Sequence, residues 1–234
     1  MNAHITTAVI LAGGAGFRLR PLTNDLPKAM MEVQGRPLLE WIINWLKRNS
    51  VYTIIIGVAY HKEAIIDYFG NGKEFDVNIN YSEHTVEGGT GEGFRLAIQR
   101  YVDDSLFIAM NGDEITNINV HDFCDFHVNN GGVATIALSY LRSPFGTVEV
   151  NNRNDIVSFI EKPLLKEYLV SMGVYLFQDR IREYLPSRGN IESTTFLRLA
   201  AERKLKGYLH KGFWGTVNTL KDLQELQTRM PESL

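Results

Sequence analysis

The sequence predicts an α/β fold in which helices cover both faces of a doubly wound, mostly parallel β-sheet. Over the first half of the 234 residues, short runs rich in Val and Ile alternate with segments of helical period. This alternation is typical of strand–helix–strand units, whose crossover connections make neighbouring strands parallel. From residue 134 onward strand follows strand, which predicts a smaller β-rich lobe.

The first half supplies strands and helices in turn. We expect strands at residues 7–11, 52–58, 77–81 and 106–110, and helices at 37–49, 62–69, 91–101 and 120–130. Helix 37–49 has the clearest pattern, because Leu38, Ile42 and Trp45 fall on one face. We interpret that stripe, with Trp41, as core or as a face for self-association.

The second half is predicted to contain more strands than helices. We expect strands at 134–141, 147–150, 156–161, 169–177 and 205–211, and helices at 179–184, 192–202 and 220–229. The turn-forming residues at 151–155 predict a hairpin between the second and third of these strands. Because no long linker divides the chain, we expect a single domain over residues 1–234.

Composition argues against several classes of protein. The formal net charge is −3 and the lysines and arginines are scattered, so we expect no nucleic-acid partner. No stretch reaches the roughly 18 to 20 apolar residues that span a bilayer, and no basic leader precedes the first apolar run. We therefore expect a cytoplasmic protein without a membrane segment. The single cysteine, Cys124, excludes an internal disulfide and is predicted to be a small core residue.

A glycine-rich loop follows the first predicted strand, with Gly13, Gly14 and Gly16 ahead of Arg18. Glycines let backbone N–H groups approach phosphate oxygens, and an arginine adds charge-assisted hydrogen bonds. The loop lacks the third glycine of GxGxxG, and no GxxxxGK[ST] occurs in the chain. We predict an anion site outside these two common classes; the alternative is a turn that only reverses the chain.

Residues 11–40, LAGGAGFRLRPLTNDLPKAMMEVQGRPLLE, closely resemble the signature of the sugar nucleotidyltransferase family, LAGGxGTRLxPLT followed by PK and GxPLL. The resemblance continues more loosely through residues 88–91, 111–113, 161–163 and 173–175. It implies a Rossmann-like nucleotidyltransferase fold. In it, residues 1–133 would bind the nucleotide and residues 134–234 the sugar phosphate, with no C-terminal β-helix domain.

The resemblance also implies a reaction. A sugar 1-phosphate attacks the α-phosphorus of a nucleoside triphosphate, giving an NDP-sugar and pyrophosphate with Mg²⁺ as cofactor. Such an attack needs positioning, cations and metal more than proton transfers. By resemblance, Arg18 steadies the triphosphate, Lys28 neutralises the reacting phosphates and Asp113 holds the metal. A helix cap is the alternative role for Asp113, and its neighbour Glu114 is expected to face solvent.

The remaining site residues follow from the same resemblance. The nucleotide is expected to contact Leu11, Ala12, Gly13, Gly14, Gly16, Glu83, Gly88 and Gly89. The sugar phosphate is expected to contact Gly146, Glu161, Lys162, Gly173 and Glu192. The alternatives are a flexible helix entrance for Gly88 and Gly89 and a surface ion pair for Glu161 and Lys162.

The chain departs from the family pattern near its end. Relatives have WxDxGT, whose aspartate completes the metal site, whereas this chain reads WGTVNT and has Thr216 at that position. A hydroxyl is a weaker Mg²⁺ ligand than a carboxylate, so the second anchor is lost, weakened or supplied from elsewhere. Phe17 replaces a threonine that is usual in the family, and we interpret this as a change that tunes the choice of substrate. The His, Cys and Asp residues at 121–127 lie on one predicted helix and cannot converge on one zinc ion.

The leading hypothesis is a hexose- or heptose-1-phosphate guanylyltransferase, with uridylyl and cytidylyl transfer left open. One alternative is transfer to a non-sugar phosphate such as phosphocholine. Another, from a different class, is a noncatalytic sensor of nucleotides or nucleotide sugars, in which Thr216 would mark lost metal chemistry. The expected partners are an NTP and a sugar 1-phosphate, and self-association into a homo-oligomer stays open.

Overall fold

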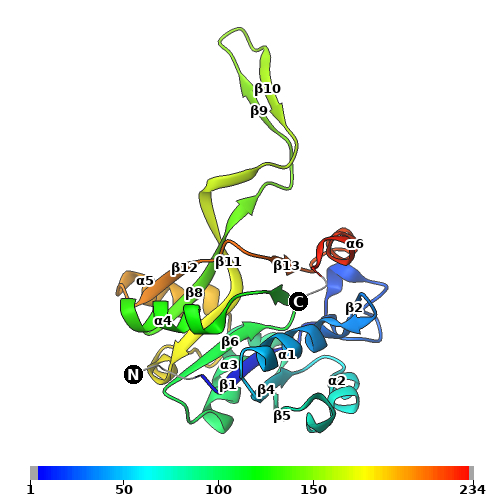
Figure 1. The fold of residues 1–234 in the computed structure, drawn as a ribbon, viewed down its shortest axis with the longest axis vertical. Coiled ribbons are helices and arrows are strands. Elements are labelled where there is room, and N and C mark those ends of the chain that lie inside the picture. Colours follow the sequence, from blue (N-terminus) through cyan, green and yellow to red (C-terminus); the bar gives the residue numbers. More distant parts are fainter. Residues whose placement is uncertain (1–4, 232–234) are drawn as a thin grey trace.

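A central seven-stranded sheet organises the protein, whose computed structural model describes residues 5–231 (Figure 1). The strand order is β12-β8-β11-β6-β1-β4-β5. These strands are β1 (Thr7–Leu11), β4 (Thr53–Val58), β5 (Asn78–Glu83), β6 (Leu106–Asn111), β8 (Ala134–Arg142), β11 (Leu164–Gln178) and β12 (Leu205–Leu209). All pairs are parallel except those of β11, which runs antiparallel to both β6 and β8. The mostly parallel sheet predicted from the sequence is confirmed.

Helices cover both faces of this sheet. They are α1 (Leu38–Arg48), α2 (Lys62–Phe69), α3 (Gly89–Tyr101), α4 (Val120–Asn130), α5 (Thr195–Ala201) and α6 (Leu220–Arg229). Successive residues of a strand point to opposite faces. Accordingly, Ile10 of β1 packs in a cluster with residues of α1, α2 and α4, and Val9 packs in a second cluster with residues of α3 and α5. The alternation along β1 thus sets two cores.

The second half of the chain extends the main sheet more than the sequence indicated. Strands β8 and β11 were expected in a second lobe, but they pair with each other, and they join β12 and β6 in the main sheet. The reason lies in β11, a 15-residue strand whose last residues, Val174 to Phe177, are buried between β6 and β8. Only its first residues lie outside the core.

A two-stranded hairpin projects from the body of the molecule (Figure 1). It is formed by β9 (Thr147–Val150) and β10 (Ile156–Ile160), and we call it the arm. The turn predicted at residues 151–155 connects the two strands, and Asn151 closes it by accepting hydrogen bonds from the backbone of Arg153 and Asp155. This hairpin is the part of the predicted β-rich lobe that separates from the sheet.

Two small antiparallel pairs were not expected. Strand β7 (Glu114–Thr116) pairs with β13 (Trp214–Thr216), and β2 (Glu32–Val33) pairs with β3 (Arg36–Pro37). Strands of two or three residues are too short to show a period of two, so no sequence pattern predicts them. The β7–β13 pair matters for function because it brings residues 214–216 beside the strand that directly follows Asp113.

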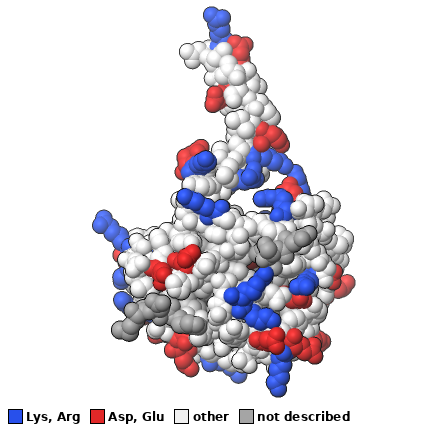
Figure 2. Space-filling model, in the orientation of Figure 1, with Lys and Arg blue, Asp and Glu red and all other residues white. Residues whose placement is uncertain are grey.

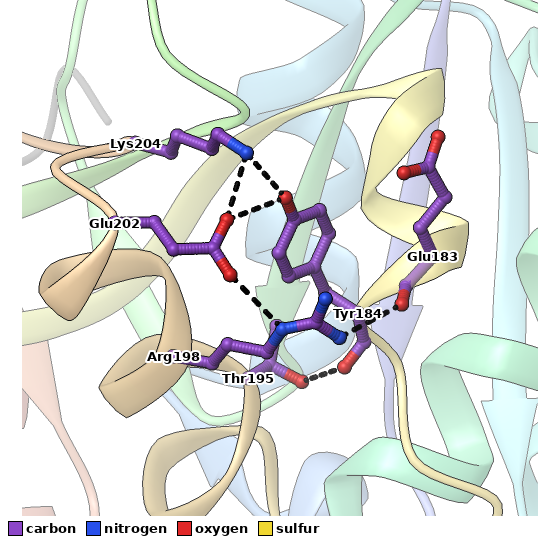
Figure 3. A network of polar contacts seen from close by, with 6 residues as sticks. All are labelled: Glu183, Tyr184, Thr195, Arg198, Glu202 and Lys204. Atoms are coloured by element: carbon purple, nitrogen blue, oxygen red, sulfur yellow. Dashed lines mark hydrogen bonds and ion pairs between the residues drawn. The ribbon is translucent and has the colours of Figure 1, made fainter.

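The predicted helices at 179–184 and 192–202 are shorter or tighter than expected. The first is a 3-10 helix, Asp179–Glu183, and the second begins as the 3-10 turn Ile191–Ser193 before α5. A polar network ties this region together (Figure 3): the Glu202 carboxylate accepts hydrogen bonds from Tyr184, Arg198 and Lys204.

No helix between residues 5 and 231 combines the length and apolar character needed to cross a bilayer.

Candidate active site

A cleft of about 270 Å³ lies at the carboxyl ends of β1 and β6, next to the first turn of α3. This edge is where open α/β sheets bind ligands. The cleft is lined by Leu11, Ala12, Gly13, Gly14, Lys28, Ala29, His84, Val86, Gly89, Thr90, Asn111, Gly112, Asp113 and Asn190. Its lining combines glycine backbone, amide side chains and one pair of opposite charges.

Two glycines beside the cleft, Gly13 in the glycine loop and Gly112 after β6, are packed too closely to accept a side chain. A Cβ on Gly13 would lie 2.7 Å from His84 Nε2, and one on Gly112 would lie 2.9 Å from the backbone oxygen of Leu11. Backbone hydrogen bonds fix the loop, because Ala12 N donates to the Gly57 oxygen and Lys28 N donates to the Gly14 oxygen. These hydrogen bonds hold the loop at the edge of the cleft, where Gly14 is exposed.

Lys28 and Asp113 form an ion pair inside the cleft. Lys28 begins the 3-10 turn Lys28–Met30, and Asp113 follows the end of β6. Their side chains are 14% and 22% exposed, so the pair is partly desolvated and its attraction is stronger than in water. The Lys28 ammonium also donates to Asn218 Oδ1 at 3.0 Å. Phosphate oxygens brought to the glycine loop would meet this ammonium.

The oxygens around Lys28 are of the kind that hard divalent cations prefer. Asp113 offers a carboxylate, and Asn218 and Asn111 offer amide oxygens nearby. Within residues 5–231, no three His, Cys, Asp or Glu residues gather as a metal cluster. A cation here would therefore need oxygens from phosphates and water as well, which suits Mg²⁺.

Glu114 was expected to face solvent, and that expectation is wrong. Glu114 is only 8% exposed, and its carboxyl accepts a hydrogen bond of 2.8 Å from Trp214 Nε1. In the β7–β13 pair it lies directly opposite Thr216. Burial, and secondarily the charge of Asp113, raises the pKa of this carboxyl well above its usual range. The unexpected strand β13 is what buries it.

Arg18 is not among the residues that line the cleft. It lies exposed on the 3-10 turn Phe17–Leu19, beside the equally exposed Phe17. The structure thus brings together two of the three residues expected at the reacting phosphates, Lys28 and Asp113. The role of Arg18 stays a prediction.

The nucleotide residues expected from the sequence divide into two groups. Those that line the cleft are Leu11, Ala12, Gly13, Gly14 and Gly89. Gly16 and Gly88 border it without lining it: Gly16, at φ 59, caps the turn that carries Arg18, and Gly88 caps α3. Glu83 turns away and pairs with Lys62 at 2.7 Å, with 64% of its side chain exposed. Its neighbour His84 lines the cleft instead.

His84 is a cleft residue that sequence reasoning missed. Its Nδ1 is buried and makes no hydrogen bond, and burial lowers the pKa of the imidazole below its ordinary value. The signal was its position, because it follows β5 at the carboxyl edge of a parallel strand. Thr90, Asn111 and Asn190 were also missed, and each carries a polar side chain into the cleft.

The expected sugar residues also fall into two groups. Glu192 and Gly173 border the cleft: Thr90 Oγ1 donates to Glu192 at 2.8 Å, and a Cβ on Gly173 would lie 2.9 Å from Asn111 Nδ2. Gly146, Glu161 and Lys162 lie at the base of the arm, outside the cleft lining. There Gly146 is close to the Glu161 carboxylate, since a Cβ on it would lie 3.0 Å from Oε2.

Comparison with known proteins identifies the class. The sequence profile described as nucleotidyl transferase matches residues 7–233, and the chain belongs to this family. The bifunctional protein GlmU of Methanococcus aeolicus is 34% identical over 97% of the chain, which spans only 55% of that protein. The mannose-1-phosphate guanyltransferase of Saccharomyces cerevisiae is 32% identical over 97% of the chain and 67% of its own length.

A solved structure confirms the predicted fold class. It is described as a putative glucose-1-phosphate thymidylyltransferase from Bacillus anthracis in complex with sucrose. The two structures have a TM-score of 0.76, with 95% of this chain and 94% of that chain covered, at 23% sequence identity. The fold is therefore the nucleotidyltransferase form of the doubly wound sheet.

Proposed function

We propose that the protein transfers a nucleoside monophosphate from an NTP to a sugar 1-phosphate, forming an NDP-sugar and pyrophosphate. The observation that carries this proposal is the Lys28–Asp113 pair beside a glycine loop, at the edge of the sheet where such folds bind ligands. The family membership and the names of the similar proteins support the same reaction.

In the proposed reaction the protein acts by positioning and by charge. Residues 1–133 bind the nucleotide, whose phosphates lie over Gly13 and Gly14, and residues 134–234 bind the sugar phosphate. Lys28 exchanges Asp113 for phosphate oxygens and stabilises the charge that develops during in-line attack. Arg18 steadies the triphosphate and the leaving pyrophosphate. Its exposed position beside the loop leaves its side chain free to reach them.

A divalent cation, most simply Mg²⁺, belongs to this proposal. Asp113 would hold it, and the ion would neutralise phosphate charge and polarise the reacting phosphoryl group. While Asp113 held such a cation, the Lys28 ammonium would be available to the substrate. The same carboxylate thus holds Lys28 in place before binding and releases it on binding.

For the sugar phosphate, we assign Glu161, Lys162 and Gly146 at the base of the arm and Gly173 and Glu192 at the border of the cleft. Guanylyl transfer to a hexose or heptose 1-phosphate is the form we favour, because the yeast relative is named as a mannose-1-phosphate guanyltransferase. Phosphocholine fits less well, since none of the residues lining the cleft is Phe, Tyr or Trp, which would form a cage for a quaternary ammonium.

A noncatalytic sensor is the second candidate, because Thr216 replaces a metal-binding carboxylate of relatives. Pyrophosphate release decides between the two. The protein is incubated with Mg²⁺, each NTP and a panel of hexose and heptose 1-phosphates. Release with one pair supports the proposed transferase and names both substrates. Nucleotide binding without release across the panel would favour the sensor. A cytoplasmic location stays a prediction.

We also propose that the protein forms a homo-oligomer through the arm. In the arm, Val150 lies opposite Ile156 and Val148 lies opposite Phe159, so these four side chains share one face. They are 48–64% exposed, and Figure 2 shows few charged atoms along much of the arm. An isolated two-stranded hairpin is only marginally stable in water, and an uncharged face can pair with its own copy about a two-fold axis.

Sedimentation analysis tests the arm. The Phe159→Asp substitution places a charge on the apolar face and should convert the assembly to monomers. Ser158→Asp is the matched control, since Ser158 pairs with Glu149 on the opposite face, and it should leave the assembly intact. A wild-type protein that sediments as a monomer, or a Phe159→Asp variant that stays assembled, would refute the arm as the interface.

A further inference from the structure

Arg18 lies in the segment 14–24, which continues the chain beyond the end of β1. Within this segment the Gly16 oxygen accepts hydrogen bonds from Leu19 N at 2.8 Å and from Thr23 Oγ1 at 2.9 Å. Thr23 is fully buried, whereas Arg18 is exposed. The turn that carries Arg18 is therefore closed by contacts of its own, but these internal contacts do not set where the turn lies relative to the cleft.

One tyrosine attaches both ends of this segment to the connection between β4 and α2. The Tyr60 backbone N–H donates to the Gly13 oxygen at 3.4 Å, and the Tyr60 hydroxyl donates to the Asn24 oxygen at 2.8 Å. Strand β4 pairs with β1 on one side and with β5 on the other, so its end is a firm support. Tyr60 thus bridges the beginning and the end of the segment from a fixed point of the sheet.

His61 brings a second donor to the same carbonyl. Its Nε2 lies 3.0 Å from the Asn24 oxygen, and this nitrogen carries a proton because a carbonyl oxygen can only accept. The His61 ring packs edge-on against the Tyr60 ring, with the centroids 4.2 Å apart. His61 also has a left-handed backbone, at φ 45 and ψ 45, which a residue with a side chain adopts where its surroundings impose it. Two neighbouring side chains therefore converge on one backbone oxygen.

We propose that Tyr60 and His61 are positioning residues for Arg18, which they hold beside the cleft by fixing the far end of its segment at Asn24. The inference rests on the proposed function for the contact between Arg18 and the triphosphate. A cation that is held in place before the substrate arrives binds it more tightly, because a loose segment would have to be ordered on binding. Loss of either donor would loosen the segment without removing any residue that lines the cleft.

Amide hydrogen exchange of the full chain, followed by mass spectrometry, tests the attachment directly. Tyr60→Phe removes the hydroxyl and should speed exchange over residues 14–24 about fivefold, the change that corresponds to one net hydrogen bond. Tyr81→Phe is the matched control, since the Tyr81 hydroxyl donates to the Gly70 oxygen at 2.7 Å in a different loop. It should leave exchange over residues 14–24 unchanged. His61→Ala should speed this exchange, and His61→Gln, which keeps a side-chain N–H donor, should speed it less.

Nucleotide binding shows whether the attachment acts through Arg18. Dissociation constants are measured for ATP, GTP, UTP and CTP with Mg²⁺ and without a sugar phosphate, so that no turnover is needed. Tyr60→Phe should weaken binding of the NTP that the unchanged protein binds best, by about fivefold. In an Arg18→Ala background the same substitution should weaken binding by less than about twofold, because two changes that act through one group are not additive.

Equal exchange over residues 14–24 in Tyr60→Phe and in the unchanged protein would overturn the proposal. A full fivefold loss of binding in the Arg18→Ala background would overturn it as well, because Tyr60 would then act independently of Arg18. Faster exchange and non-additive binding in a protein that releases no pyrophosphate with any substrate pair would uphold the positioning role and refute the proposed transferase.

Discussion

The Lys28 ammonium and the Asp113 carboxylate, 85 residues apart in sequence, meet in the cleft, and each is the nearest opposite charge to the other. The contact depends on two strand ends, because the loop after β1 brings Lys28 and the end of β6 brings Asp113. A pair of this kind holds both groups ready while no substrate is present. The ion pair also couples the two side chains, since freeing one of them frees the other.

Lys28→Ala should therefore lower kcat by about 100-fold or more, with a smaller effect on KM, because the lysine acts on charge that develops in the transition state. Steady-state pyrophosphate release measures both constants, and circular dichroism checks that the variant folds. Lys47→Ala, which removes an exposed ion pair with Asp76, is the control and should keep full activity. Full turnover by Lys28→Ala would show that Lys28 is not a catalytic residue.

Much of this centre was predictable from the sequence, because strands ending in polar residues meet at one edge of a parallel sheet. That argument, with the family resemblance, selected Lys28, Asp113 and the glycine loop. It missed His84 and chose Glu83, since a one-residue difference at a strand end reverses the side-chain direction. It also missed the burial of Glu114, which depends on the three-residue strand β13, from a segment 100 residues further along the chain.

The arm shows the same limit of prediction from local sequence patterns. The hairpin itself was predicted from its turn residues, which act locally. Whether its strands join the main sheet depends on what lies beside them in space, and no local pattern reports that. The same holds for β8 and β11, which are rich in apolar residues like the arm strands and yet belong to the main sheet.

Gly112→Ala should destabilise the protein by about 1–3 kcal/mol, because the added methyl group would press against the backbone oxygen of Leu11, which cannot move aside without breaking the loop. Gly14→Ala is the matched control for stability, since a Cβ there meets nothing within 4 Å. Urea unfolding of the three proteins measures the difference. Equal unfolding free energies for both variants would mean that the loop is less tightly packed than described.

Three histidines with lowered pKa values should each reduce the free energy of unfolding as the pH decreases below about 6.5. Burial lowers the pKa values of His84, His127 and His210 below their ordinary value of 6.5. The unfolded chain then binds protons that the folded protein does not, which favours unfolding as the pH falls through this range. His127→Gln should reduce this slope between pH 7.5 and 5.5 in urea titrations.

Asn130→Ala is the control for that slope, because this exposed residue of α4 has no titratable side chain. It should leave the pH dependence unchanged. His127, by contrast, is buried and bonds to Thr135 Oγ1 at 2.7 Å, so protonation of its ring has to occur without water. An identical slope in His127→Gln and in the unchanged protein would show that His127 does not contribute.

The polar network around Glu202 predicts a second, separate loss of stability at lower pH. Hydrogen bonds first from Lys204 and then from Tyr184 lower the pKa of Glu202 from 4.5 to about 2. A carboxylate with a depressed pKa stabilises the folded state above the unfolded value, and this contribution is lost as the pH falls from about 4.5 towards 2. Glu202→Gln should therefore be less stable than the unchanged protein at pH 6, and the difference should shrink between pH 5 and 3.

Glu183→Gln is the control, since Glu183 joins the network only through its backbone oxygen (Figure 3). If the difference in stability between Glu202→Gln and the unchanged protein stays constant over this pH range, the network does not act through the charge of Glu202.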